Sequence, residues 1–98
     1  MENKLLGYYH AIEESSRMML EAAKAEDWEG VVRYEGSCAV LIEQLRFRAR
    51  SEALDASDRI EKSYIMQRIL SNDAQIRDLA EPWMPHFERQ LEGAQLLH

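Results

Sequence analysis

A chain of 98 residues with 46% hydrophobic and 31% charged residues is long enough for one hydrophobic core and too apolar for disorder, so we expect a single domain over residues 1–98. No run approaches the roughly 20 consecutive apolar residues of a transmembrane helix, and the first residues lack a secretory signal pattern, which predicts no membrane insertion. The single cysteine and the net charge of -6 favour the reducing cytoplasm and disfavour direct binding to nucleic acid.

Residue types that favour helices dominate the sequence. Threonine is absent, valine occurs three times, and Pro82 and Pro85 are the only prolines. The composition therefore predicts an all-α fold, and three periodic segments in the chain predict an antiparallel bundle of three main helices.

The first helix is predicted from about Asn3 to Lys24, with Asn3 as its N-cap. Residues three or four positions apart form one face of this helix. They are Leu5, Tyr9, Ile12, Ser16, Met19 and Ala23. The periodicity stops at residues 25–27, which predicts a turn.

The second helix is predicted to begin after an Asp27 cap and to end near Arg50. Its apolar face consists of Val31, Tyr34, Cys38, Leu41 and Leu45. Arg46, Arg48 and Arg50 alternate with Phe47 and Ala49 at its end, a pattern that also occurs in nucleic-acid sites. Cations at a helix C-terminus complement the helix dipole, and in an acidic chain we interpret this run as a solvated helix end.

The third helix is predicted to begin at one of two caps, Asp55 or Ser57. Its core face carries Ile65, Ile69, Asn72, Ile76, Leu79 and Trp83, and extends to Phe87 and Leu91 if the chain stays helical. Pro82 and Pro85 each remove a backbone hydrogen bond, so the helix is expected to kink or break between Ala80 and His86.

Three further apolar residues of this helix, Met66, Leu70 and Met84, point about a third of a turn away from the core face. Two interpretations stay open. The helix either buries a wide face against two neighbouring helices, or it exposes a groove for a partner, for which flexible methionines are well suited.

The sequence offers no catalytic constellation, metal site or cofactor motif. The three histidines lack the Glu-x-x-His spacing of helical metal sites, and the glycines stand apart rather than in a phosphate loop. Cys38 lies on an apolar face, where it is expected to be a core residue. All-helical chorismate mutases are also short, and they gather several arginines and a lysine around a dianionic substrate. Here the first helix has only Lys4 and Arg17 before its terminal Lys24, which fits that class badly. We therefore predict a protein that is not an enzyme.

Two segments resemble the FliT family of flagellar export chaperones. They are Met-Leu-Glu-Ala-Ala-Lys-Ala-Glu-Asp-Trp at residues 19–28 and Ile-Leu-Ser-Asn-Asp-Ala-Gln-Ile at residues 69–76. The resemblance covers about residues 4 to 95. It implies a helical hairpin followed by a long third helix that binds the filament-cap protein FliD before export.

The resemblance also implies delivery to the export ATPase complex of FliI and FliJ and restraint of the transcriptional activator FlhDC. The partner surface of the family falls on Met66, Leu70 and Arg77 of the third helix, and we add Met84 to this candidate site. A small helical co-regulator without an export role is the alternative, and a homo-oligomer stays open.

Overall fold

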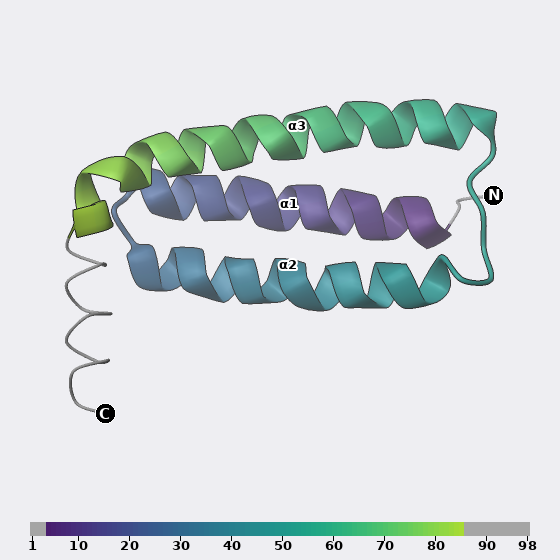
Figure 1. Cartoon of the computed structure of the whole chain (residues 1–98), viewed down its shortest axis with the longest axis horizontal. Helices are drawn as coiled ribbons and strands as arrows, with labels where there is room; N and C mark the ends of the chain where they lie inside the picture. Colours follow the sequence, from purple (N-terminus) through teal and green to yellow (C-terminus); the bar gives the residue numbers. More distant parts are fainter. Residues whose placement is uncertain (1–3, 86–98) are drawn as a thin grey trace.

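The computed structural model describes residues 4–85 and consists of three α-helices and one short 3-10 helix. The elements are α1 (Lys4–Lys24), α2 (Trp28–Arg48), α3 (Ala56–Ala80) and η1 (Glu81–Trp83). Consecutive α-helices run antiparallel, and residues 4–85 contain no strand (Figure 1). The predicted fold class is confirmed, although α2 ends at Arg48. The Asn3 cap and positions Phe87 and Leu91 lie outside the described residues.

A tight turn closes α1 and opens α2. The amide of Asp27 donates to the carbonyl of Ala22 at 2.8 Å, and the amide of Glu26 donates to that of Ala23 at 3.1 Å, which together form a Schellman motif. Glu26 has a φ of 60°, a left-handed conformation that costs about 1–2 kcal/mol without glycine. The Asp27 carboxylate then accepts a hydrogen bond from the Gly30 amide at 3.0 Å, as an N-cap. Asp27 thus holds both helix ends together.

The ends of α3 follow the predicted chemistry. Of the two predicted caps it is Asp55 that accepts a hydrogen bond from the backbone amide of Asp58, at 2.8 Å, while Ser57 donates its hydroxyl to Asp55 at 2.9 Å. The α-helix stops at Ala80, and η1 with Pro82 follows. The predicted break at the prolines is therefore confirmed.

The two tryptophans join the end of α3 to the start of α2. The rings of Trp83 and Trp28 have centroids 6.1 Å apart and are inclined by 58°. Next to this pair, Leu20 and Ala23 of α1 pack against Ile76 of α3 in a buried cluster. This end of the bundle is therefore closed by side chains from all three helices.

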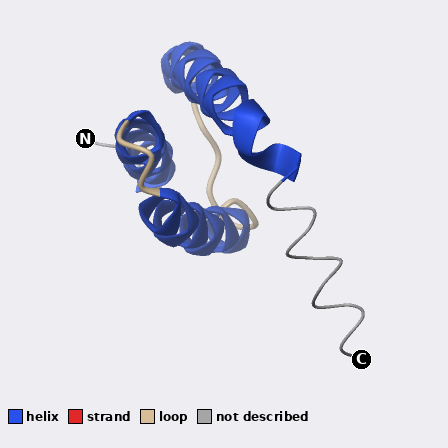
Figure 2. Ribbon diagram, turned by 90° about the vertical axis from the view of Figure 1, so that its left-hand side faces the viewer, coloured by secondary structure: helices blue, strands red, loops and turns tan. Residues whose placement is uncertain are grey.

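Helix α1 packs against both α2 and α3, whereas α2 and α3 scarcely touch each other. Figure 2 shows the helices nearly end-on, with α3 above and α2 below α1. Consequently α1 supplies most of the buried residues, namely Leu5, Ile12, Ser16, Leu20, Ala22 and Ala23. Helix α2 buries only Gly30, and α3 buries Ile65 and Ile76, among the described residues. Leu20 and Ala22, which the predicted face of α1 omitted, are buried as well, because α1 packs against two neighbouring helices and so buries a wider face.

Ion pairs connect α1 to α3 along their exposed edge. Arg68 donates two hydrogen bonds to the Glu13 carboxylate, at 2.7 and 3.0 Å. The His10 ring and the Glu61 carboxylate lie 3.0 Å apart in the same row. The hydrogen bonds from Arg68 are the main reason why the pKa of Glu13 lies below its ordinary value.

Substitution of Glu13 by glutamine should make the stability of the protein less dependent on pH. The Glu13 pKa is lower in the folded than in the unfolded chain, so its stabilising contribution is present above the ordinary glutamate pKa. It is lost as the pH falls through the lowered pKa. Urea unfolding should therefore show Glu13→Gln to be less stable than the parent near pH 7, and the difference should disappear once the pH lies below the lowered pKa of Glu13. In an Arg68→Gln background the substitution should have no effect; an equal loss there would contradict the pairing.

Two glycines of α2 should respond oppositely to alanine. A Cβ atom at Gly30 would collide with the Asp27 carboxylate and lie 3.3 Å from the Cβ of Ala22, whereas nothing lies within 4 Å at Gly36. Gly30→Ala should lower the free energy of unfolding by about 1–3 kcal/mol through overpacking. Gly36→Ala should raise it by about 0.5–1 kcal/mol, because the unfolded chain loses conformational entropy. Chemical denaturation of both variants checks this. If both substitutions stabilise the protein, the turn can shift to accommodate a Cβ atom at Gly30 and the predicted overpacking is wrong.

Candidate partner-binding groove between α2 and α3

The side chains of all three helices enclose a groove between α2 and α3, with α1 as its floor. It consists of two adjoining cavities of about 410 and 350 Å³, both lined by Ile12, Ile42 and Ile69. Its other lining residues are Tyr9, Ser16 and Met19 of α1, Val31, Glu35, Cys38, Leu45, Arg46 and Ala49 of α2 and its C-cap, and Lys62, Met66, Leu70, Asp73 and Ile76 of α3. The lining is thus mostly apolar and includes four charged residues.

The structure brings two of the four predicted site residues into this groove. Met66 lines one cavity and Leu70 the other, and their exposed fractions are 37% and 59%. Arg77 lies beside the groove, where its guanidinium pairs with the lining residue Asp73 at 2.8 Å. Met84 follows η1 and is 47% exposed, and it lines neither cavity.

Several groove residues have a different role from the one their helical face predicted. Ile69, expected in the core, is half-buried and lines both cavities, as does Ile42, which the predicted face of α2 omitted. Ile42 lies four residues after Cys38, so helical spacing alone could have placed it beside that face. Tyr9 and Met19 also line the groove rather than a closed core. These residues remain accessible because α2 and α3 do not pack against each other above α1.

Cys38 is a protonated, half-buried member of the groove wall. Burial raises the pKa of its thiol, the negative charge of Glu35 raises it further, and a hydrogen bond with Ser15 acts in the opposite direction. Its Sγ lies 4.0 Å from the carbonyl oxygen of Ile12. A thiol in this state is a poor nucleophile, so its contribution is to apolar packing.

The arginines at the end of α2 are engaged by neighbouring side chains. Arg46 lies 3.6 Å from Glu43, and Arg48 lies 4.0 Å from Glu52. The Arg50 guanidinium lies 6.0 Å from the centre of the Phe47 ring. These local contacts agree with the interpretation of the run as a solvated helix end.

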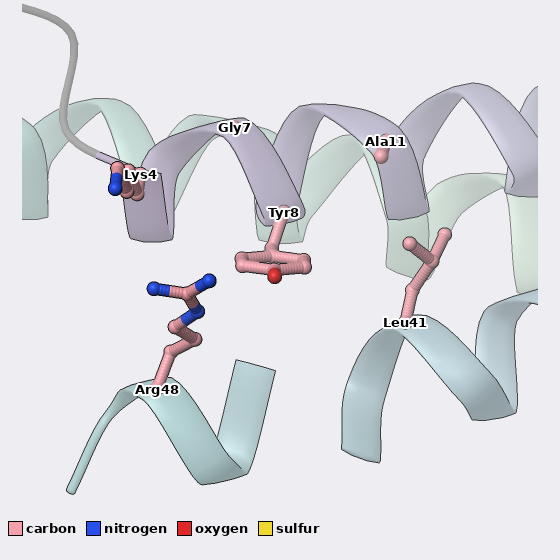
Figure 3. Close-up of a pocket in the computed structure, with 6 residues that line it drawn as sticks. All are labelled: Lys4, Gly7, Tyr8, Ala11, Leu41 and Arg48. Carbon is pink, nitrogen blue, oxygen red and sulfur yellow. The ribbon is translucent and has the colours of Figure 1, made fainter. Parts of the chain in front are cut away.

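A separate hollow of about 340 Å³ lies between α1 and α2 and shares no lining residue with the groove. Figure 3 shows its residues, with the Tyr8 ring and the Arg48 side chain extending toward one another from the two helices. Lys4, Gly7, Ala11 and Leu41 complete it. It contains none of the predicted site residues.

Within residues 4–85, no group of three or more histidine, cysteine, aspartate or glutamate side chains is placed to hold a metal ion. No helix in this part of the chain is long and apolar enough to cross a bilayer.

Comparisons with known proteins agree with the fold and with the resemblance of the two segments. The model of the family described as "Flagellar protein FliT" matches residues 6–96. The crystal structure of flagellar protein FliT from Bordetella bronchiseptica superposes with a TM-score of 0.73 at 34% sequence identity, over 88% of this chain and 98% of that one. No curated protein has a significantly similar sequence. On the strength of the family match over nearly the whole chain, this protein is a member of the FliT family of flagellar proteins.

Proposed function

We propose that this protein is a cytoplasmic flagellar export chaperone that is not an enzyme and that holds an apolar helical segment of the filament-cap protein FliD in the groove. The observation that carries the proposal is the open apolar groove between α2 and α3 in a FliT-family chain. An amphipathic helix placed there would contact all three helices and complete the packing that α1 begins.

The groove residues suit reversible capture of such a segment. Leu70 and Met66 are exposed in the free protein, so covering them removes apolar surface from water without unfolding the bundle. Met66 and Met19 have flexible side chains that can repack around different apolar anchors. Reversible capture of this kind suits a chaperone, because it shields its bound segment only until export.

The proposal extends to two further partners. The protein delivers the bound cap protein to the export ATPase complex of FliI and FliJ, and it restrains FlhDC by direct protein contact. The net charge of -6 supports contact with the activator protein rather than with DNA, because an acidic protein repels phosphates. Calorimetric titrations with a FliD segment and with FlhDC distinguish an export chaperone from a co-regulator: binding of FlhDC alone would favour the co-regulator.

Leu70→Ala should weaken binding of the FliD segment and leave the fold intact. Leu70 is 59% exposed, and substitutions at such surface positions usually change stability by no more than about 0.5 kcal/mol. Calorimetric titration should show a loss of at least tenfold in affinity, equivalent to about 1.4 kcal/mol. Alkylation of Cys38 provides a second readout, since an occupied groove should protect this thiol.

Ile65→Ala is the matched control on the same helix. Ile65 is 0% exposed, so truncation should lower the free energy of unfolding by about 2–5 kcal/mol. It should weaken binding only in proportion to the unfolded fraction. If Leu70→Ala instead destabilises the protein as strongly as Ile65→Ala and leaves affinity unchanged for the folded fraction, Leu70 is a core residue and the groove is not the binding site.

A further inference from the structure

Opposite charges line the two ends of the groove. The cavity at the end of α2 and the start of α3 is lined by Arg46 and Lys62 and by no described acidic residue. The cavity at the other end is lined by Glu35 and Asp73 and by no described basic residue. The groove therefore has a basic end and an acidic end, separated by the shared isoleucines.

The contacts of these four residues leave the charge difference available to a ligand. Arg46 and Asp73 pair with Glu43 and Arg77 on their own helices, and such exposed pairs exchange partners at little cost. The Lys62 ammonium lies over the Tyr9 ring, 5.3 Å from its centre, which leaves its positive charge intact. Among the described residues, the carboxylate of Glu35 has no ion pair, and its negative charge contributes to the raised pKa of Cys38 inside the groove.

We propose that a helical partner segment binds in one direction, with its N-terminus at Glu35 and Asp73 and its C-terminus at Arg46 and Lys62. The inference rests on the proposed function of the groove and adds the orientation and charge pattern of the ligand. A helix carries about half a positive charge at its N-terminus and half a negative charge at its C-terminus, so this direction places each pole beside the opposite charge.

The same arrangement selects side-chain charges. A segment with basic residues in its first turn, acidic residues in its last turn and apolar residues between them complements the whole groove. Its chain then runs parallel to α2 and antiparallel to α1 and α3. The reversed segment would bring like charges together at both ends.

The two native tryptophans make the direction measurable. Trp28 and Val31 pack against the same buried cluster, Val31 lines the acidic end, and the Trp83 ring lies 6.1 Å from that of Trp28. Ala49, after the last turn of α2, lines the basic end. Helix α2 has 21 residues, so its ends lie about 31 Å apart, and the tryptophans lie nearer the acidic end than the basic end.

The test uses two synthetic tryptophan-free peptides of about 14 residues, each about 21 Å long as a helix, with identical apolar positions. One has lysines in its first turn and glutamates in its last turn, and the other has these charges exchanged. We expect the first to bind at least threefold more tightly at low salt, with the ratio approaching one at high salt. The second is the better isolated helix, because its charges complement its own dipole, so helix propensity cannot produce the expected preference.

Dansyl labels on either end of the first peptide determine its direction. Energy transfer from Trp28 and Trp83 should be stronger to an N-terminal than to a C-terminal label. The double variant Glu35→Lys, Lys62→Glu keeps the net charge but leaves one acidic and one basic residue at each end of the groove. It should therefore remove the preference between the peptides, while its circular dichroism stays that of the parent.

The outcomes separate the direction from the groove. Equal affinities for the two peptides at low salt, or stronger transfer to the C-terminal label, would overturn the direction and leave the groove in place. Failure of both peptides to bind would overturn the proposed groove and the direction with it. Binding of both peptides to the double variant with equal affinity would support both, whereas an unchanged preference there would overturn the direction.

Discussion

The architecture depends on α1 being shared by two helices that do not pack against each other. Apolar surface has to be covered, and α1 covers that of both neighbours, so most buried residues belong to α1. Helices α2 and α3 contribute half-buried walls rather than a closed core. In a three-helix bundle that closes on itself, these walls would meet. Here their separation leaves a groove whose apolar lining needs no rearrangement before it receives another helix.

The connections between the helices differ in length, and so does the separation of α2 from α3 at the two ends of the bundle. A turn of three residues, 25–27, holds α1 and α2 together at the tryptophan end, and Asp27 hydrogen-bonds in both helices there. At the opposite end, residues 49–55 connect α2 to α3 and let them lie further apart. The larger cavity, about 410 Å³, lies at this opposite end. Figure 1 shows the short connection between α1 and α2 and the longer one between α2 and α3.

The sequence alone predicts where the helices begin and end. Which helix faces pack against each other is known only from the structure. The Asp27 and Asp55 caps and the stop before Pro82 depend on neighbours within a few residues, so the sequence reveals them. The left-handed Glu26 has no glycine to signal it. Ile69 appeared to be a core residue because periodicity shows that a face is apolar and not what covers it. The charge difference along the groove becomes visible only when α2 and α3 are placed side by side.

The shared helix also determines how the fold opens. Contacts between α2 and the α3 end are concentrated around Trp28, Val31, Ile76 and Trp83, so separating α2 from α1 leaves most contacts of α3 intact, and the converse holds. Native-state amide hydrogen exchange should therefore show two units that open independently, with α1 protected until both have opened. A ligand that touches α2 and α3 at once would merge these units into one. Occupying the groove would therefore make local unfolding cooperative across the whole bundle, even though no helix moves.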